Sequence, residues 1–162
     1  MFAAVISSGH PAAYDVLVGL HVACAVIGFG AVAITGAYGA IGRNVGRPGS
    51  RREAPEEVAR YFASGFALEY LVLVAPVFGL AAMSVRPGGS EFGQLWAWGG
   101  VAVWVLAGGL LTAVVRPAAR RIRQAGTEIE AVTGEARRLM WAAAASDLLF
   151  VVALFLMVTQ PR

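Results

Sequence analysis

Residues 14–41, YDVLVGLHVACAVIGFGAVAITGAYGAI, form a nearly continuous apolar run. At about 1.5 Å of rise per residue, a helix of this length crosses the hydrocarbon core of a bilayer, which is about 30 Å thick. The run is too long for a membrane strand and does not alternate between apolar and polar residues. It therefore predicts a transmembrane helix, and it sets the class of the whole chain.

Three further apolar stretches have the length that a transmembrane helix needs: residues 61–83, 96–115 and 139–159. Of the 162 residues, 58% are hydrophobic and 14% are charged, whereas soluble domains carry about 25% charged residues. This composition excludes a disordered chain and an ordinary soluble enzyme. The prediction is an all-α fold: one domain, residues 1–162, that forms a polytopic bundle of four transmembrane helices.

The arginines predict how this bundle is oriented. All 13 basic residues are Arg, and 11 of them lie in two loops, residues 42–60 and 116–138. The positive-inside rule makes these loops cytoplasmic and puts both termini outside the cytoplasm, in a multi-pass protein of the inner (plasma) membrane. The same rule accounts for the net charge of +3, so no nucleic acid is expected as a partner. The expected partners are the lipid bilayer and other membrane subunits or a second copy of the chain.

The first apolar run has two distinguishable faces. Small or polar residues recur every seven positions on one of them: His21, Gly28, Thr35 and Gly42. Large aliphatic residues recur on the other: Leu20, Ile27, Ile34 and Ile41. Because small residues let helices approach closely, the first face is expected to pack inside the bundle and the second to face lipid.

Ionisable residues inside membrane spans are costly, by about 2.5–3.5 kcal/mol for Asp, and this chain has three: His21, Glu69 and Asp147. His21 lies only six residues beyond Asp15, in the outer half of its span. One interpretation makes it a hydrogen-bonded packing residue. The alternative makes it an axial haem ligand, a metal ligand or a proton carrier.

Glu69 and Asp147 are predicted to lie at one depth, about 13 Å into the membrane, because each follows an interfacial Arg by nine residues. Thr35, Tyr70 and Ser146 are expected in the same polar layer, with His21 about 15 Å away from it. Two carboxylates in a medium of low dielectric constant do not both ionise cheaply. The layer is therefore either a set of neutral interhelical hydrogen bonds or a proton or cation site.

Pro76 interrupts the second apolar stretch. It removes one helical hydrogen bond and leaves the Val72 carbonyl without its usual donor, so a kink is expected there. No Ser/His/acid arrangement, phosphate-binding glycine loop or His/Cys cluster is visible, and Cys24 is the single cysteine. The sequence therefore assigns no catalytic residue and no metal site, and it favours a non-enzymatic role without deciding the question.

Three short motifs resemble one known family: LVGLHVACAVIGFG around His21, APVFGLAAM in the second stretch, and VVRPAARRIR after the third. The terminal FLMVTQP resembles the ending of the same family. The chain is similar to an uncharacterised bacterial family of four-helix integral membrane proteins, classed as a domain of unknown function. That family is distantly similar to copper-resistance protein D and to membrane protoporphyrinogen oxidases.

The resemblance implies that His21 is associated with haem, as the early histidine is in the oxidase group. That group also requires a membrane lysine, and this chain has no Lys, so the resemblance does not extend to protoporphyrinogen oxidation. No cluster of Met or His ligands for copper is visible in the sequence.

Three functions remain open from the sequence, and its biochemical activity stays undetermined. The first is an accessory or complex-forming membrane component. The second is a haem- or redox-linked membrane protein that uses His21. The third is a proton- or cation-coupled transporter that uses Glu69 and Asp147, with Thr35 and Tyr70 beside them.

Overall fold

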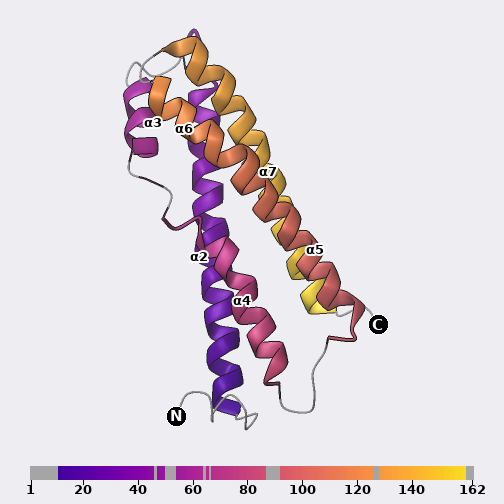
Figure 1. Ribbon diagram of the computed structural model, residues 1–162. Helices are drawn as coiled ribbons and strands as arrows, with labels where there is room; N and C mark the ends of the chain where they lie inside the picture. Colours follow the sequence, from indigo (N-terminus) through magenta and orange to yellow (C-terminus); the bar gives the residue numbers. More distant parts are fainter. Residues whose placement is uncertain are drawn as a thin grey trace.

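The structure is a computed structural model that describes residues 11–45, 47–49, 54–63, 65, 67–86, 92–125 and 128–159. Its regular secondary structure in these ranges is entirely helical, as the apolar runs predict (Figure 1). The elements are α2 (Pro11–Gly42), α3 (Ala54–Ala63), α4 (Leu71–Ser84), α5 (Leu95–Leu110), the π-helical turn η1 (Leu111–Val115), α6 (Arg116–Ala125) and α7 (Ile129–Thr159).

Three of the described helical stretches are long and apolar enough to cross a membrane: Ala12–Gly42, Leu95–Ala125 and Glu130–Thr159. Each has 30 or 31 residues, which is about 45 Å of helix and exceeds the hydrocarbon thickness of a bilayer. Only about a fifth of each apolar window is buried inside the protein. The remaining apolar surface points outward, as expected for helices surrounded by lipid.

Helix α2 packs against both α4 and α7. Glycines make this close approach possible on both sides. A Cβ atom added at Gly28 would lie 2.6 Å from the Val72 backbone nitrogen of α4, and one added at Gly36 would lie 2.9 Å from the Ala143 Cβ of α7. The inward face predicted for the first apolar run is therefore the packed face.

The predicted outward face of α2 is confirmed for three of its four aliphatic residues. Leu20, Ile27 and Ile34 are exposed, with Ile34 at 54%. Ile41 differs, because it is partly buried against the core. At this end of the bundle α3 packs against α2, and the core cluster against which Ile41 packs includes Val58 and Phe62 of α3.

The second apolar stretch differs from the continuous helix expected over residues 61–83. Helix α3 ends at Ala63, α4 begins at Leu71, and α4 has only 14 residues. Gly65 lies in the interruption with a φ of 93°, a left-handed conformation that residues with a Cβ rarely adopt. The interruption places Glu69 just before α4 rather than within a regular helix.

The third helix does not end at Val115, where the apolar stretch ends, but continues through α6 to Ala125. The two parts join through η1, in which the Arg116 N–H donates to the Leu111 carbonyl five residues earlier. This wider turn immediately precedes Pro117, whose ring would crowd the carbonyl four residues earlier in a regular α-helix. The loop expected over residues 116–138 is accordingly largely helical, and α7 begins at Ile129.

The best-packed core lies where α3, α6, the end of α2 and the start of α7 meet; we call this the arginine end. Fully buried side chains there include Val58, Phe62, Ile122, Ala136 and Leu139. Most described arginines lie at this end, and α2 begins and α7 ends at the opposite end (Figure 1).

Candidate functional site

A cavity of about 380 Å³ lies between α2, α4, α5 and α7 in the half of the bundle away from the arginine end. Its walls are mainly aliphatic and aromatic, with contributions from Phe29, Trp96, Trp104 and Phe150. The volume falls within the lower part of the range of small-molecule pockets. The cavity therefore has the size and the lining of a site for a largely apolar ligand.

His21 of α2 brings an imidazole to this cavity. Its Nδ1 lies 2.7 Å from the Ala75 carbonyl oxygen of α4. A carbonyl oxygen only accepts hydrogen bonds, so Nδ1 carries a proton, and in the neutral imidazole Nε2 has the lone pair. Gly79 makes room for the ring, because a Cβ atom there would lie 2.9 Å from Nδ1.

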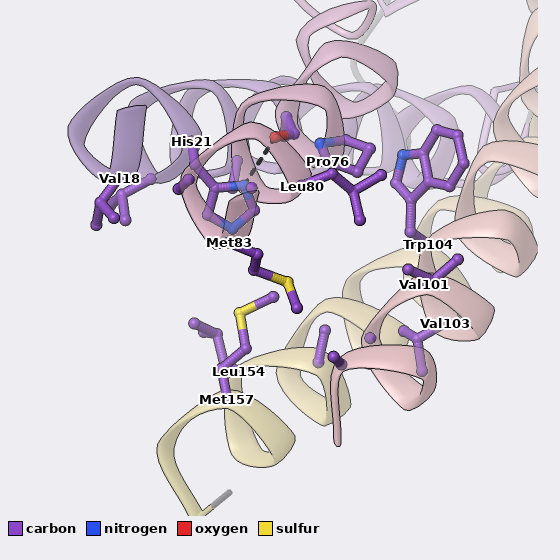
Figure 2. A pocket seen from close by; sticks show the side chains of 18 of the residues that line it. Val18, His21, Pro76, Leu80, Met83, Val101, Val103, Trp104, Leu154 and Met157 are labelled. Atoms are coloured by element: carbon purple, nitrogen blue, oxygen red, sulfur yellow. Dashed lines mark hydrogen bonds between the residues drawn. The ribbon is translucent and has the colours of Figure 1, made fainter. Parts of the chain in front are cut away.

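Pro76 and Trp104 build the adjoining wall. The Val72 carbonyl, which has no helical donor because Pro76 lacks an N–H, accepts a hydrogen bond from the Trp104 indole at 2.9 Å. The carbonyl that Pro76 leaves open is thus satisfied by α5, and the bond fixes the indole against the cavity. Figure 2 shows Trp104 beside Pro76 at one side of the cavity, with His21 farther along.

Two methionines lie on the same side of the cavity as the free edge of the imidazole. Met83 comes from α4 and Met157 from α7, and their thioethers point toward one another (Figure 2). Thioether sulfur is a soft ligand and also packs well against flat aromatic groups. The cavity therefore combines an imidazole, two thioethers and mainly apolar walls, and Tyr14 and Arg86 also line it.

Glu69 and Thr35, both predicted in the polar layer, are hydrogen-bonded to each other. The Thr35 hydroxyl donates to the Glu69 Oε1 at 2.8 Å, and both residues are buried. The Tyr61 hydroxyl lies 2.8 Å from the same Thr35 oxygen. Because a threonine hydroxyl has one proton, Tyr61 is the donor in this arrangement. The result is a directed chain from Tyr61 through Thr35 to Glu69, in which the Tyr61 ring also stacks on Tyr38 at 3.9 Å.

Ser146 and Asp147 are not part of this chain. The Ser146 hydroxyl is buried and has no hydrogen-bond partner in the described part of the protein. Asp147 is half-buried, and no hydrogen bond or ion pair joins it to another described residue. The structure thus assembles one carboxylate of the predicted pair into a hydrogen-bonded cluster and leaves the other outside it.

Tyr70 turns away from the buried cluster. It is 40% exposed, its hydroxyl accepts a hydrogen bond from the Arg116 guanidinium, and that guanidinium lies 4.7 Å from its ring centroid. Tyr70 therefore belongs to the surface beside α6, although it follows Glu69 directly in the sequence.

The cavity and the polar cluster are separate sites. Neither Thr35 nor Glu69 lines the cavity, and His21 and Thr35 are 14 residues apart on α2, which is about 21 Å of helix. Sequence reasoning did not identify Met83, Met157, Trp104 or Tyr61. The one signal in the sequence concerns Trp104. Pro76 leaves the Val72 carbonyl without its helical donor, so a donor from a neighbouring helix is required.

Within the described ranges, no three His, Cys, Asp or Glu side chains gather closely enough to hold a metal ion. A ligand at the cavity would therefore depend on His21 and the thioethers rather than on a conventional metal cluster. In the comparisons with known proteins, no family model, curated protein or solved structure matches the chain.

Proposed function

We propose that the chain is a multi-pass protein of the bacterial inner membrane that holds a flat, largely apolar cofactor at His21, and that the cofactor is haem. The observation that carries this proposal is the His21 imidazole. Its Nδ1 is committed to the Ala75 carbonyl, which leaves the Nε2 lone pair for a ligand. Metal-binding histidines typically donate their second ring N–H to a carbonyl or carboxylate in this way.

The other residues of the cavity fit the same cofactor. Histidine imidazole and methionine thioether both hold haem iron in known proteins, and Met83 or Met157 would supply the thioether here. Phe29, Phe150 and Trp104 offer apolar and aromatic surface for a flat ring. When bound, haem would supply a redox-active iron.

Entry to the cavity from the lipid phase is also supported. Val26 and Leu154 line the cavity and are nevertheless 58% and 45% exposed on the outside of the bundle. An apolar molecule dissolved in the membrane therefore reaches the cavity between helices without crossing a polar surface.

The proposal is tested by adding haem to the detergent-purified protein and recording the absorption spectrum. The wild-type protein is expected to develop a Soret band that saturates at one haem per chain. The His21→Ala variant is expected to bind at least tenfold more weakly, because the imidazole nitrogen that would hold the haem is lost. A Soret titration that is the same for both proteins would exclude His21 as the ligand.

Cys24→Ala is the matched control for this experiment. Cys24 is one turn beyond His21 on α2 and does not line the cavity. Its replacement changes a partly buried side chain of the same helix without touching the proposed ligand. The control is expected to bind haem as the wild type does, and loss of binding in both variants would point to damage to the helix instead.

A second candidate, proton transfer through the buried polar cluster, is favoured by the hydrogen-bonded chain Tyr61–Thr35–Glu69. Such a chain can reverse the direction of all its hydrogen bonds when a proton enters at one end. Asp147, the second carboxylate in this hypothesis, takes no part in the hydrogen bonds that join Tyr61, Thr35 and Glu69. Protein reconstituted in liposomes that moves no protons under a pH gradient would exclude this candidate.

The predicted accessory or complex-forming role is compatible with either candidate. It is supported by glycines that face outward: Gly19 and Gly30 of α2 and Gly109 of α5 have open space where a Cβ would stand. Helices of a partner subunit can approach such positions closely. We also infer that the chain crosses the membrane four times. Helix α4 would add a crossing to those of the three long helices, because it lies beside α2 and runs in the opposite direction (Figure 1).

A further inference from the structure

Three arginines of α6 surround a small hollow at the arginine end of the bundle. Arg116, Arg120 and Arg123 are four and three residues apart, so they lie on one face of the helix. Together with Gly65 and Tyr70 they line a hollow of about 150 Å³. This hollow is distinct from the His21 cavity and shares no residue with it.

The positive charge in the hollow is not neutralised by the described part of the protein. No carboxylate lines it. The ion pairs described at this end are formed elsewhere, since Glu135 of α7 pairs with Arg121 at 3.2 Å and with Arg138 at 3.3 Å. Arg121 is on the same helix as the three arginines, but it faces α7. The hollow therefore concentrates guanidinium groups that have no negative partner among the described residues.

Two features give the hollow a defined shape. The Arg116 guanidinium lies over the Tyr70 ring and donates to the Tyr70 hydroxyl, so its position is fixed. Gly65 also lines the hollow, in a left-handed conformation, and no atom lies within 4 Å of the place where its Cβ would be. A tetrahedral anion can thus approach the backbone of Gly65 while it contacts the guanidinium groups.

The depth of the hollow matches that of a lipid headgroup. Arg116 directly follows Val115, the last residue of the apolar stretch of its helix, and the charged turns of α6 begin there. On the neighbouring helix, Trp141 is 65% exposed at the start of the apolar part of α7. An exposed tryptophan at this position is typical of the interface between hydrocarbon and headgroups.

We propose that this hollow binds a phosphate group through Arg116, Arg120 and Arg123, and that the phosphate belongs to the headgroup of an anionic phospholipid. A guanidinium group matches two phosphate oxygens with two parallel N–H donors. Basic pockets between membrane helices on the cytoplasmic side are known headgroup sites. The proposal does not depend on the ligand of the His21 cavity.

The test measures thermal unfolding of the detergent-purified protein with phosphatidylglycerol, with phosphatidylcholine, or with glycerol 3-phosphate alone. Phosphatidylglycerol is expected to raise the unfolding temperature of the wild type, and phosphatidylcholine is expected to have little effect. In the Arg120→Gln/Arg123→Gln variant, about 25 times more phosphatidylglycerol is expected to be needed for the same shift, which corresponds to fivefold for each arginine.

The matched control is Arg60→Gln/Arg137→Gln, which removes the same charge from exposed positions of α3 and α7 outside the hollow. It is expected to respond to phosphatidylglycerol as the wild type does. If both double variants lose the response equally, the effect is one of total charge and the proposal is wrong. The same conclusion follows if phosphatidylcholine protects as well as phosphatidylglycerol.

The soluble ester separates the two sources of phosphate. If glycerol 3-phosphate protects the wild type as well as phosphatidylglycerol does, and the hollow variant loses that protection, the arginines bind phosphate but the lipid assignment is wrong. If only the lipid protects, the headgroup assignment holds. Arg120→Lys is expected to give an intermediate response, because it keeps the charge and loses the paired donors.

Discussion

At the scale of single residues, Thr35 carries the clearest energetic consequence. Its side chain is fully buried, and its hydroxyl joins Tyr61 to Glu69. Thr35→Val keeps the shape of the side chain but leaves the Glu69 Oε1 without this donor and the Tyr61 hydroxyl without this acceptor. We expect a loss of about 1–3 kcal/mol in the free energy of unfolding, measured by thermal or denaturant unfolding in detergent.

Thr35→Ser is the control for this prediction, because it retains the hydroxyl and removes only a methyl group. It is expected to recover most of the stability lost in Thr35→Val, with a residual cost of about 1 kcal/mol for the buried methyl group. If the valine variant unfolds at the wild-type temperature and the serine variant does not, packing rather than hydrogen bonding holds this position.

The sequence predicts the depth of a polar residue better than its direction. Counting from interfacial arginines places Thr35 and Glu69 at one level, and these two residues are indeed bonded. The same count places Tyr70 with them, yet Tyr70 faces Arg116. Glu69 and Tyr70 lie in the turn just before α4, where consecutive side chains point in different directions, so neighbours at equal depth meet different partners. The packing of the helices decides which side chains point into the bundle, and the depth of a residue in the membrane does not predict this.

At the scale of elements, the contact between α2 and α4 depends on Gly28. A Cβ atom there would lie 2.6 Å from the Val72 backbone nitrogen, and backbone atoms cannot move aside cheaply. Gly28→Ala is therefore expected to separate the two helices and to lower the free energy of unfolding by about 1–3 kcal/mol. Because His21 and Ala75 bridge the same two helices, the variant is also expected to weaken ligand binding at the cavity.

Gly30→Ala is the matched substitution for this prediction. Gly30 is on the same helix two residues later, and nothing lies within 4 Å of its Cβ position. Replacing it is expected to leave stability unchanged or to raise it by up to about 1 kcal/mol, because alanine favours the helix. Equal unfolding temperatures for the two variants would contradict the close approach of α2 and α4.

The apolar runs predicted where helices occur but not all of their ends. Residues 14–41 correspond closely to α2, because a long uninterrupted run leaves the backbone few alternatives. The stretch over 61–83 is equally apolar and nevertheless breaks, since hydropathy does not register the left-handed Gly65. Helices α6 and α7 extend through the predicted loop because they pack on each other and share the Arg121–Glu135 ion pair.

At the scale of the whole molecule, packing is divided between the two ends. The arginine end has a dense core of aliphatic and aromatic side chains, whereas the opposite end surrounds the His21 cavity. No single run of sequence encodes this cavity, because residues from four helices line it. The sequence singles out His21 because an ionisable side chain is costly inside a membrane. It does not single out Met83 and Met157, because only the folded structure brings them to the same cavity as His21.

The charge asymmetry between the two ends leads to a prediction of topology. Arg120, Arg121 and Arg123 of α6 lie at the end where α7 starts, and the positive-inside rule assigns that end to the cytoplasm. In a Cys24→Ala background, a cysteine introduced by Gly93→Cys at the opposite end is expected to react with a membrane-impermeant thiol reagent in intact cells. One introduced by Glu130→Cys in the exposed first turn of α7 is expected to react only after the membrane is permeabilised.

Both positions are exposed in the structure, so a difference in their labelling reports the side of the membrane rather than burial. The reverse labelling pattern would place the arginines outside the cytoplasm and would remove the basis for a cytoplasmic headgroup site at α6.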